Sequence, residues 1–183
     1  MPEFWVSSDV MPDGSYAVSV TVNKDIAFAL DDAAARDYAA TCFTEATAAD
    51  HAGAVVRLMT QQMRMSTKAA QDFVRLYLGE YRETHVQLQF RAAVGRRKPP
   101  HPDAGSFIPA VLVFSGSESL GWIDPDELRD HAGGVLSALA ASRFDEQLRQ
   151  TLTDPDGVDL DDAAARKVVS SLAQFMPSRG EQS

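Results

Sequence analysis

The residues best placed to do chemistry are a glutamate and a histidine four positions apart, Glu127 and His131. On a helix this spacing puts both side chains on one face, where they could supply two ligands to a metal ion. A zinc site needs three or four ligands, and the other histidines, His51, His85 and His101, form no metal-type pair with another histidine. A solvent-facing ion pair within one helical turn is therefore the preferred interpretation. A small metal-dependent enzyme or binder stays an alternative.

The acidic segment from Asp154 to Asp162 suggests a calcium loop. An EF-hand loop carries acidic ligands at its first, third and fifth positions, glycine at the sixth and glutamate at the twelfth. With Gly157 at the sixth position, Leu152 takes the first and Ala163 the twelfth. The ligand set fails at both ends, so the segment is predicted to be a turn followed by a helix cap.

Two segments could carry a nucleophile. Cys42, the single cysteine, falls in an alanine-rich apolar stripe, which supplies neither a base nor an electropositive setting. Ser115 to Ser119 lacks the Gly-x-Ser-x-Gly pattern of a hydrolase elbow and is predicted to be a hairpin turn. The glycine patterns that bind phosphates and dinucleotides are absent. The sequence therefore predicts no catalytic residue, no metal-binding or cofactor-binding residue, no cofactor and no enzyme.

One basic cluster stands out in an acidic chain. The 183 residues carry 17 basic and 26 acidic side chains, a formal net charge of −9, which makes nucleic-acid binding or acidic mimicry a lesser alternative. A solvated loop is the default interpretation of the cluster, and contact with an acidic partner is the functional one. The candidate interaction residues, within the loop 95–102, are Arg96, Arg97, Lys98, Pro99, Pro100 and His101.

Composition also bears on location. A single cysteine cannot form an intramolecular disulfide, which favours a reducing compartment. The N-terminus does not resemble a secretory signal, and no apolar run approaches the roughly 18 residues of a membrane span. We therefore expect a cytoplasmic protein that makes no membrane contact.

The chain contains an internal duplication at an offset of about 93 residues. The turn at Pro12 matches that at Pro102, and Ala17–Val20 matches Ala110–Val113. The following helices match at the same offset, and the second helices of the two halves match best at an offset of 94. Agreement across four successive elements is harder to obtain by chance than one local identity. The paired helix positions include Leu30 with Ile123, Asp31 with Asp124, Cys42 with Val135, Phe43 with Leu136, Ala46 with Leu139, and Val74 with Val168.

Each half is predicted to contain two strands, a short third strand, a long helix and a shorter helix. Strands are expected at 4–10, 16–22 and 25–30 and again at 85–94, 109–114 and 120–123; helices at 31–63, after Ser66, from Asp124 to the break at Asp154, and at 161–175. Alternation places Val18, Val20 and Val22 on one face, which the helix at 31–63 is expected to cover.

The predicted fold class is α+β, with the two antiparallel sheets and their helices in a pseudo-twofold arrangement. The two repeats, 1–84 and 85–176, are expected to form one compact unit, followed by a disordered tail at 177–183.

The run from Gly121 to Ala132, with its preceding hairpin and its following alanine-rich helix, resembles uncharacterised proteins of actinobacteria and their phages. The resemblance implies a source and a fold style, and it brings no catalytic residues. We expect a non-catalytic protein-interaction or regulatory protein that a phage could encode and that acts on a host protein. A homodimer is left open.

Overall fold

The computed structural model describes residues 1–78, 82–83, 88–96 and 107–172, and its fold is α+β as predicted. The first half contains β1 (Phe4–Val10), β2 (Tyr16–Val22), β3 (Ile26–Leu30), α1 (Asp32–Gln61) and α2 (Thr67–Leu78). The second half contains β4 (Arg82–Glu83), β5 (Leu88–Arg96), β6 (Phe107–Ser115), β7 (Glu118–Ile123), α3 (Pro125–Thr153) and α4 (Asp162–Leu172). The two-residue strand β4 is the element that the sequence did not predict. The tail at 177–183 lies outside the described residues.

The strands form two antiparallel sheets. Sheet A has the order β1-β2-β3, and sheet B has the order β4-β5-β6-β7. The β1–β2 hairpin closes through Gly14, whose φ of +84° favours glycine, and the β6–β7 hairpin closes through Gly116, with a φ of +56°. The prediction that Ser115 to Ser119 forms a hairpin turn is therefore confirmed.

The helices begin at the residues that the sequence marks as caps. The carboxylate of Asp31 accepts a hydrogen bond from the backbone N–H of Ala34 at 2.8 Å, and Asp124 accepts one from Asp126 at 2.9 Å, with Pro125 in the first turn. These two caps stand 93 residues apart, as the repeat requires.

The two shorter helices are capped by Ser66 and Asp161, whose side chains accept from the backbone N–H groups three residues on. These caps are 95 residues apart, and so are the buried pairs Ala70 with Ala165 and Val74 with Val169. The predicted offset of 94 for these helices is therefore wrong by one. The offset grows from 93 at the caps of the long helices to 95 at the caps of the short helices, because the segment between these two caps is two residues longer in the second half.

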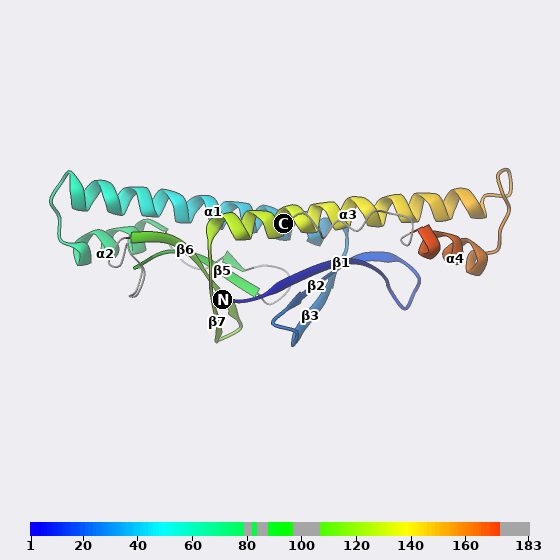
Figure 1. The fold of residues 1–183 in the computed structure, drawn as a ribbon, viewed down its shortest axis with the longest axis horizontal. Helices are drawn as coiled ribbons and strands as arrows, with labels where there is room; N and C mark the ends of the chain where they lie inside the picture. The colour runs from blue at the N-terminus through cyan, green and yellow to red at the C-terminus, as the bar shows by residue number, and fades with distance from the viewer. Residues whose placement is uncertain (79–81, 84–87, 97–106, 173–183) are drawn as a thin grey trace.

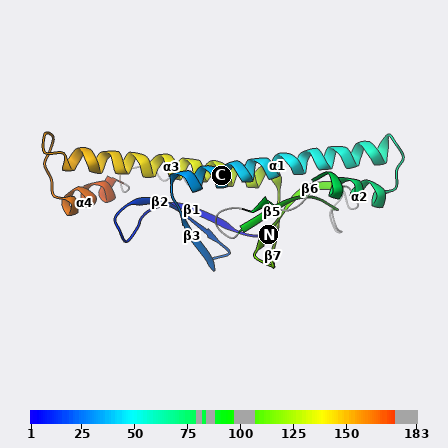
Figure 2. The same cartoon turned by 180° about the vertical axis from the view of Figure 1, so that it is seen from behind.

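The long helices α1 and α3 form one layer, and both sheets with the short helices form the other (Figure 1). Each long helix starts near the middle of the molecule and runs outward, so the two overlap antiparallel near their N-termini, and the view from behind shows the same arrangement (Figure 2). Helices α2 and α4 fold back beneath the outer ends of α1 and α3.

Each long helix packs mainly on the sheet of the other half. Helix α1 lies on β5 and β6, and α3 lies on β1 and β2. The expectation that the first long helix covers the valines of β2 is therefore wrong, because α3 covers Val18, Val20 and Val22. One hydrophobic cluster accordingly combines residues of both sheets and both long helices.

The duplication is visible in the burial of the long helices. Five pairs of long-helix positions 93 residues apart are buried in both halves: Ala35 with Leu128, Ala39 with Ala132, Cys42 with Val135, Ala46 with Leu139, and Ala49 with Ser142. In every pair except Ala39 with Ala132, the residue of α1 is smaller than its match in α3.

Candidate functional site

The two repeats meet at a polar pair on the pseudo-twofold axis. Tyr38 and His131 occupy equivalent positions, 93 residues apart, and Tyr38 Oη lies 3.0 Å from His131 Nε2. Phe4 packs against the imidazole with ring centroids 4.4 Å apart, and Phe90 packs edge-on against the Tyr38 ring. Burial lowers the pKa of His131 to about 4 and raises that of Tyr38 well above its usual value. At neutral pH the pair is an uncharged contact inside the core.

The position of His131 beside Tyr38 separates it from Glu127, with which the sequence paired it. The histidine points into the core toward Tyr38, whereas Glu127 is exposed. The preferred interpretation of the two as an exposed ion pair is therefore wrong, since the imidazole is partly buried against Tyr38 and its lowered pKa keeps it neutral at neutral pH. Among the described residues, no three His, Cys, Asp or Glu side chains gather closely enough to hold a metal ion.

Cys42 is fully buried on α1, one helical turn after Tyr38. Burial raises the pKa of its thiol far above the ordinary value. A thiol that stays protonated and has no access to solvent is a poor nucleophile. The interpretation of Cys42 as a buried packing residue is confirmed.

The acidic segment between α3 and α4 is a turn and a helix cap, as predicted. Asp154 Oδ1 accepts from the backbone N–H of Asp156 at 3.0 Å, and Asp161 caps α4. Asp159 adopts a positive φ of +55° within this turn. These carboxylates therefore organise the backbone.

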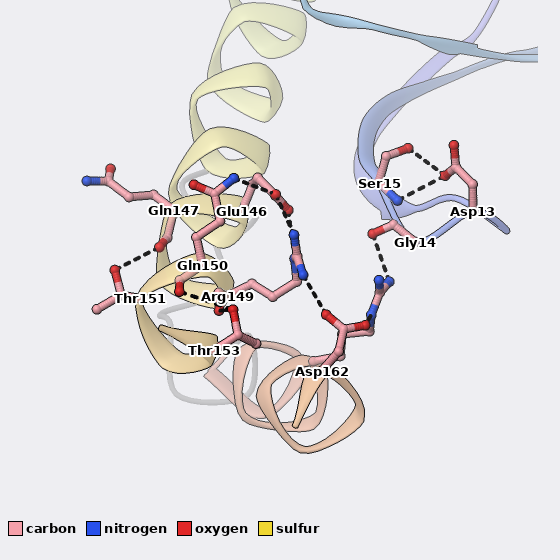
Figure 3. Close-up of polar contacts among 11 residues, drawn as sticks. Asp13, Gly14, Ser15, Glu146, Gln147, Arg149, Gln150, Thr151, Thr153 and Asp162 are labelled. Carbon is pink, nitrogen blue, oxygen red and sulfur yellow. Dashed lines mark hydrogen bonds and ion pairs between the residues drawn. The ribbon is translucent and has the colours of Figure 1, made fainter. Parts of the chain in front are cut away.

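A chain of ion pairs ties this end of the molecule together (Figure 3). Arg149 donates to both oxygens of Glu146, at 2.9 and 2.7 Å, and to Asp162 at 2.5 Å. Arg166 donates to Asp162 at 2.6 Å and to the carbonyl oxygen of Gly14 at 2.7 Å. Hydrogen bonds from Arg166 lower the pKa of Asp162, and those from Arg149 lower that of Glu146. The network is a structural joint between α3, α4 and the β1–β2 turn.

The predicted basic loop lies almost entirely outside the described residues. Arg96 is the last residue of β5, while Arg97, Lys98, Pro99, Pro100 and His101 fall in the range 97–106, which the structure does not describe. Strand β5 nevertheless leads directly toward this loop, and its preceding residues line a groove.

That groove lies between α2 and sheet B and has a volume of about 470 Å³. Helix α2 is held there by a second hydrophobic cluster, in which Ala70 and Val74 pack with Ala52, Val56 and Met59 of α1. The groove is lined from the helix by Lys68, Gln71, Asp72, Val74, Arg75 and Leu78 and from the sheet by Arg91, Ala93, Val94 and Leu112.

The groove combines apolar walls with positive charge. Among the described residues that line it, Lys68, Arg75 and Arg91 carry positive charge and Asp72 is the one carboxylate, while Val74, Leu78, Val94 and Leu112 supply apolar surface. This excess of cations occurs in a protein with a net charge of −9. Sequence analysis missed the groove because Lys68, Arg75 and Arg91 are scattered in the chain and converge only through the packing of α2.

A buried carboxylate on α1 positions β5. Glu45 is 6% exposed, and its Oε2 accepts a hydrogen bond from the backbone N–H of Ala92 at 2.9 Å. Among the described residues, β4 pairs with Gln89 and Phe90 of β5, and the bond to Glu45 satisfies a buried backbone donor further along the same strand. Glu45 was not singled out from the sequence, since an acidic residue in a helix is ordinarily solvent-exposed.

Comparison with known proteins gives no match: no protein-family model, no curated protein and no solved structure is similar to this chain. Within the described part of the chain, no helix is long and apolar enough to cross a membrane.

Proposed function

We propose that this protein is a non-catalytic binding protein that takes an acidic segment of a protein partner into the groove between α2 and sheet B. The observation that carries the proposal is the groove itself, whose described lining includes three cations, five apolar side chains and one carboxylate. Such a lining complements a segment with carboxylates flanking an apolar side chain.

The surrounding elements support this use of the groove. Its helix is fixed by the cluster around Val74, and its strand is fixed by the bond from Ala92 to Glu45. A groove with rigid walls loses little conformational entropy when a ligand binds.

The biological setting belongs to the same proposal. A cytoplasmic regulator from an actinobacterium or its phage, acting on a host protein, fits the resemblance and the cysteine usage of the sequence. Its effect would come from occupying a surface of the partner.

The test compares affinity capture from an actinobacterial lysate by the wild-type protein and by Arg75→Glu. Arg75 lies on an exposed part of the groove wall, so the charge reversal leaves the fold intact. We expect the captured partner to bind the variant about tenfold more weakly, measured by titration of the purified partner.

Arg57→Glu is the matched control, because Arg57 is equally exposed and lies on α1, outside the groove lining. The proposal requires that Arg57→Glu bind as the wild type does. It fails when no protein is captured, or when the partner binds all three proteins equally.

A further inference from the structure

The α1–α3 layer carries a basic patch on its exposed surface, formed by Arg36, Leu136, Arg143 and Phe144 around Asp32. Asp32 and Arg143 also border a hollow beside Tyr16 and Ala17 of β2. The patch residues other than Asp32 border a cavity of about 550 Å³. Arg143 Nη2 donates to Asp32 Oδ2 at 2.6 Å, and Arg36 Nη2 lies 3.2 Å from the same oxygen. Two guanidiniums therefore share one carboxylate, beside a phenylalanine that is 71% exposed.

An acidic patch lies at the other end of the helix overlap, formed by Phe43, Asp50, Asp126 and Arg129. Arg129 donates to Asp126 Oδ1 at 2.7 Å and also to Asp50. Phe43 is exposed on the same helix as Asp50, two turns before it. Here two carboxylates share one guanidinium, the inverse of the charge pattern in the basic patch.

The two patches are related by the pseudo-twofold axis. Asp50 of the acidic patch and Arg143 of the basic patch stand 93 residues apart, the offset of the repeat. They therefore lie at equal distances on opposite sides of the axis, which passes where Tyr38 meets His131. At this pair of equivalent positions the two repeats carry opposite charges, whereas the equivalent pair Arg36 and Arg129 carries the same charge.

Between the two patches, small residues leave few side-chain atoms on the surface of the helices. Gly133 and Gly134 lie within α3, where glycine weakens a helix relative to alanine, and a Cβ at either position would meet no atom within 4 Å. Ala40 is the exposed residue of α1 equivalent to Gly133. This surface allows another helix layer to approach closely.

We propose that this face is the interface of a homodimer. A second copy, turned over about an axis perpendicular to the long helices and lying in the plane of their layer, places its acidic patch on the basic patch of the first copy. The same rotation places its basic patch on the acidic patch of the first. Each contact occurs twice, as in any twofold interface, and the exposed Phe43, Leu136 and Phe144 are covered.

Charge selects this rotation over its alternative. Turning the second copy about the long axis of the helices would place Arg143 on Arg143 and Asp50 on Asp50, which is unfavourable. The face is large enough, since two helices of 30 and 29 residues, each about 45 Å long and about 10 Å wide, present on the order of 900 Å². A standard interface buries about 800 Å² per partner. The groove between α2 and sheet B lies among the elements on the other side of the layer, and the dimer does not depend on it.

The test uses two charge-reversal variants, Asp50→Arg and Arg143→Asp, studied alone and as an equimolar mixture by analytical ultracentrifugation. Both side chains are about half exposed, so the monomer fold is retained, which circular dichroism checks. We expect the wild type to dimerise at concentrations up to about 100 μM and each variant to dimerise at least about tenfold more weakly, because each reversal places like charges together twice. The mixture should recover the dimer, since the arginine of one variant then meets the aspartate of the other in both halves of the interface.

Two controls complete the experiment. Lys167→Glu reverses an exposed charge on α4 and should dimerise as the wild type does, and so should the chain shortened to end at Leu172. A monomeric wild type, variants that dimerise normally, a mixture that stays monomeric, or a dimer lost on shortening the chain would each overturn the proposal.

Discussion

Acidification should destabilise this protein through the histidine at its centre. His131 is partly buried against Phe4 and Tyr38, and its pKa in the folded state is about 4, compared with an ordinary value of 6.5. Between these two pH values the unfolded chain binds a proton that the folded protein does not bind. Stability therefore falls as pH decreases through 6.5, and the loss is complete below about pH 4.

The magnitude follows from the two pKa values. Each pH unit within the window costs about 1.4 kcal/mol, so the fall from pH 6.5 to pH 5 removes about 2 kcal/mol and the whole window removes about 3 kcal/mol. Hydrogen bonds from arginines lower the carboxyl pKa values of Asp32, Asp162 and Glu146 below their ordinary values of 3.8 and 4.5, so these groups add a loss of stability as pH approaches those ordinary values. The comparison with a variant that lacks His131 separates the two losses.

The assay is urea unfolding at several pH values between 7.5 and 5, for the wild type and the double variant Tyr38→Phe with His131→Phe. Replacing both partners of the hydrogen bond leaves no buried hydroxyl or ring nitrogen unsatisfied. The variant should lose about 2 kcal/mol less than the wild type between pH 6.5 and pH 5. Parallel pH dependences for the two proteins would refute the assignment of the acid sensitivity to His131.

Two further predictions concern the joints of the fold. Cutting the chain between Thr84 and His85 should give two pieces that do not fold as monomers but recover native circular dichroism when mixed, because each long helix covers the sheet of the other half; a folded monomeric piece would contradict this packing. Gly14→Ala should lower the free energy of unfolding by about 1–3 kcal/mol, since φ is +84° and a Cβ would lie 2.1 Å from the Arg166 guanidinium. Gly116→Ala, with φ of +56° and no atom near its Cβ, should cost less, and equal losses in urea unfolding would count against the contact with Arg166.

Much of the local structure could be predicted from the sequence. The caps Asp31, Ser66, Asp124 and Asp161 and the turn at Gly14 act through hydrogen bonds to residues two or three positions away, or through a single backbone angle. All the residues that form such a cap or turn lie within a few positions of one another in the sequence. The helix boundaries and the hairpins followed from them directly.

The candidate sites could not be predicted in the same way. Lys68, Arg75 and Arg91 line one groove only because Ala70 and Val74 dock α2 against α1 near the end of sheet B. The buried Glu45 likewise depends on a backbone donor 47 residues away. The residue pattern of a helix or a strand does not indicate which sequence-distant backbone group it contacts.

The sequence by itself determined the caps, the turns, the alternation of strands and helices and the duplication, because these depend on local bonds and on repeated patterns. Only the tertiary structure decided which sheet each long helix covers. The apolar stripe of an amphipathic helix does not distinguish one apolar sheet from the other. The direction in which α1 leaves β3 carries it over β5 and β6. That exchange joins the repeats into one core, brings Tyr38 to His131, and sets the opposite charges of Asp50 and Arg143 at equivalent positions of the α1–α3 layer.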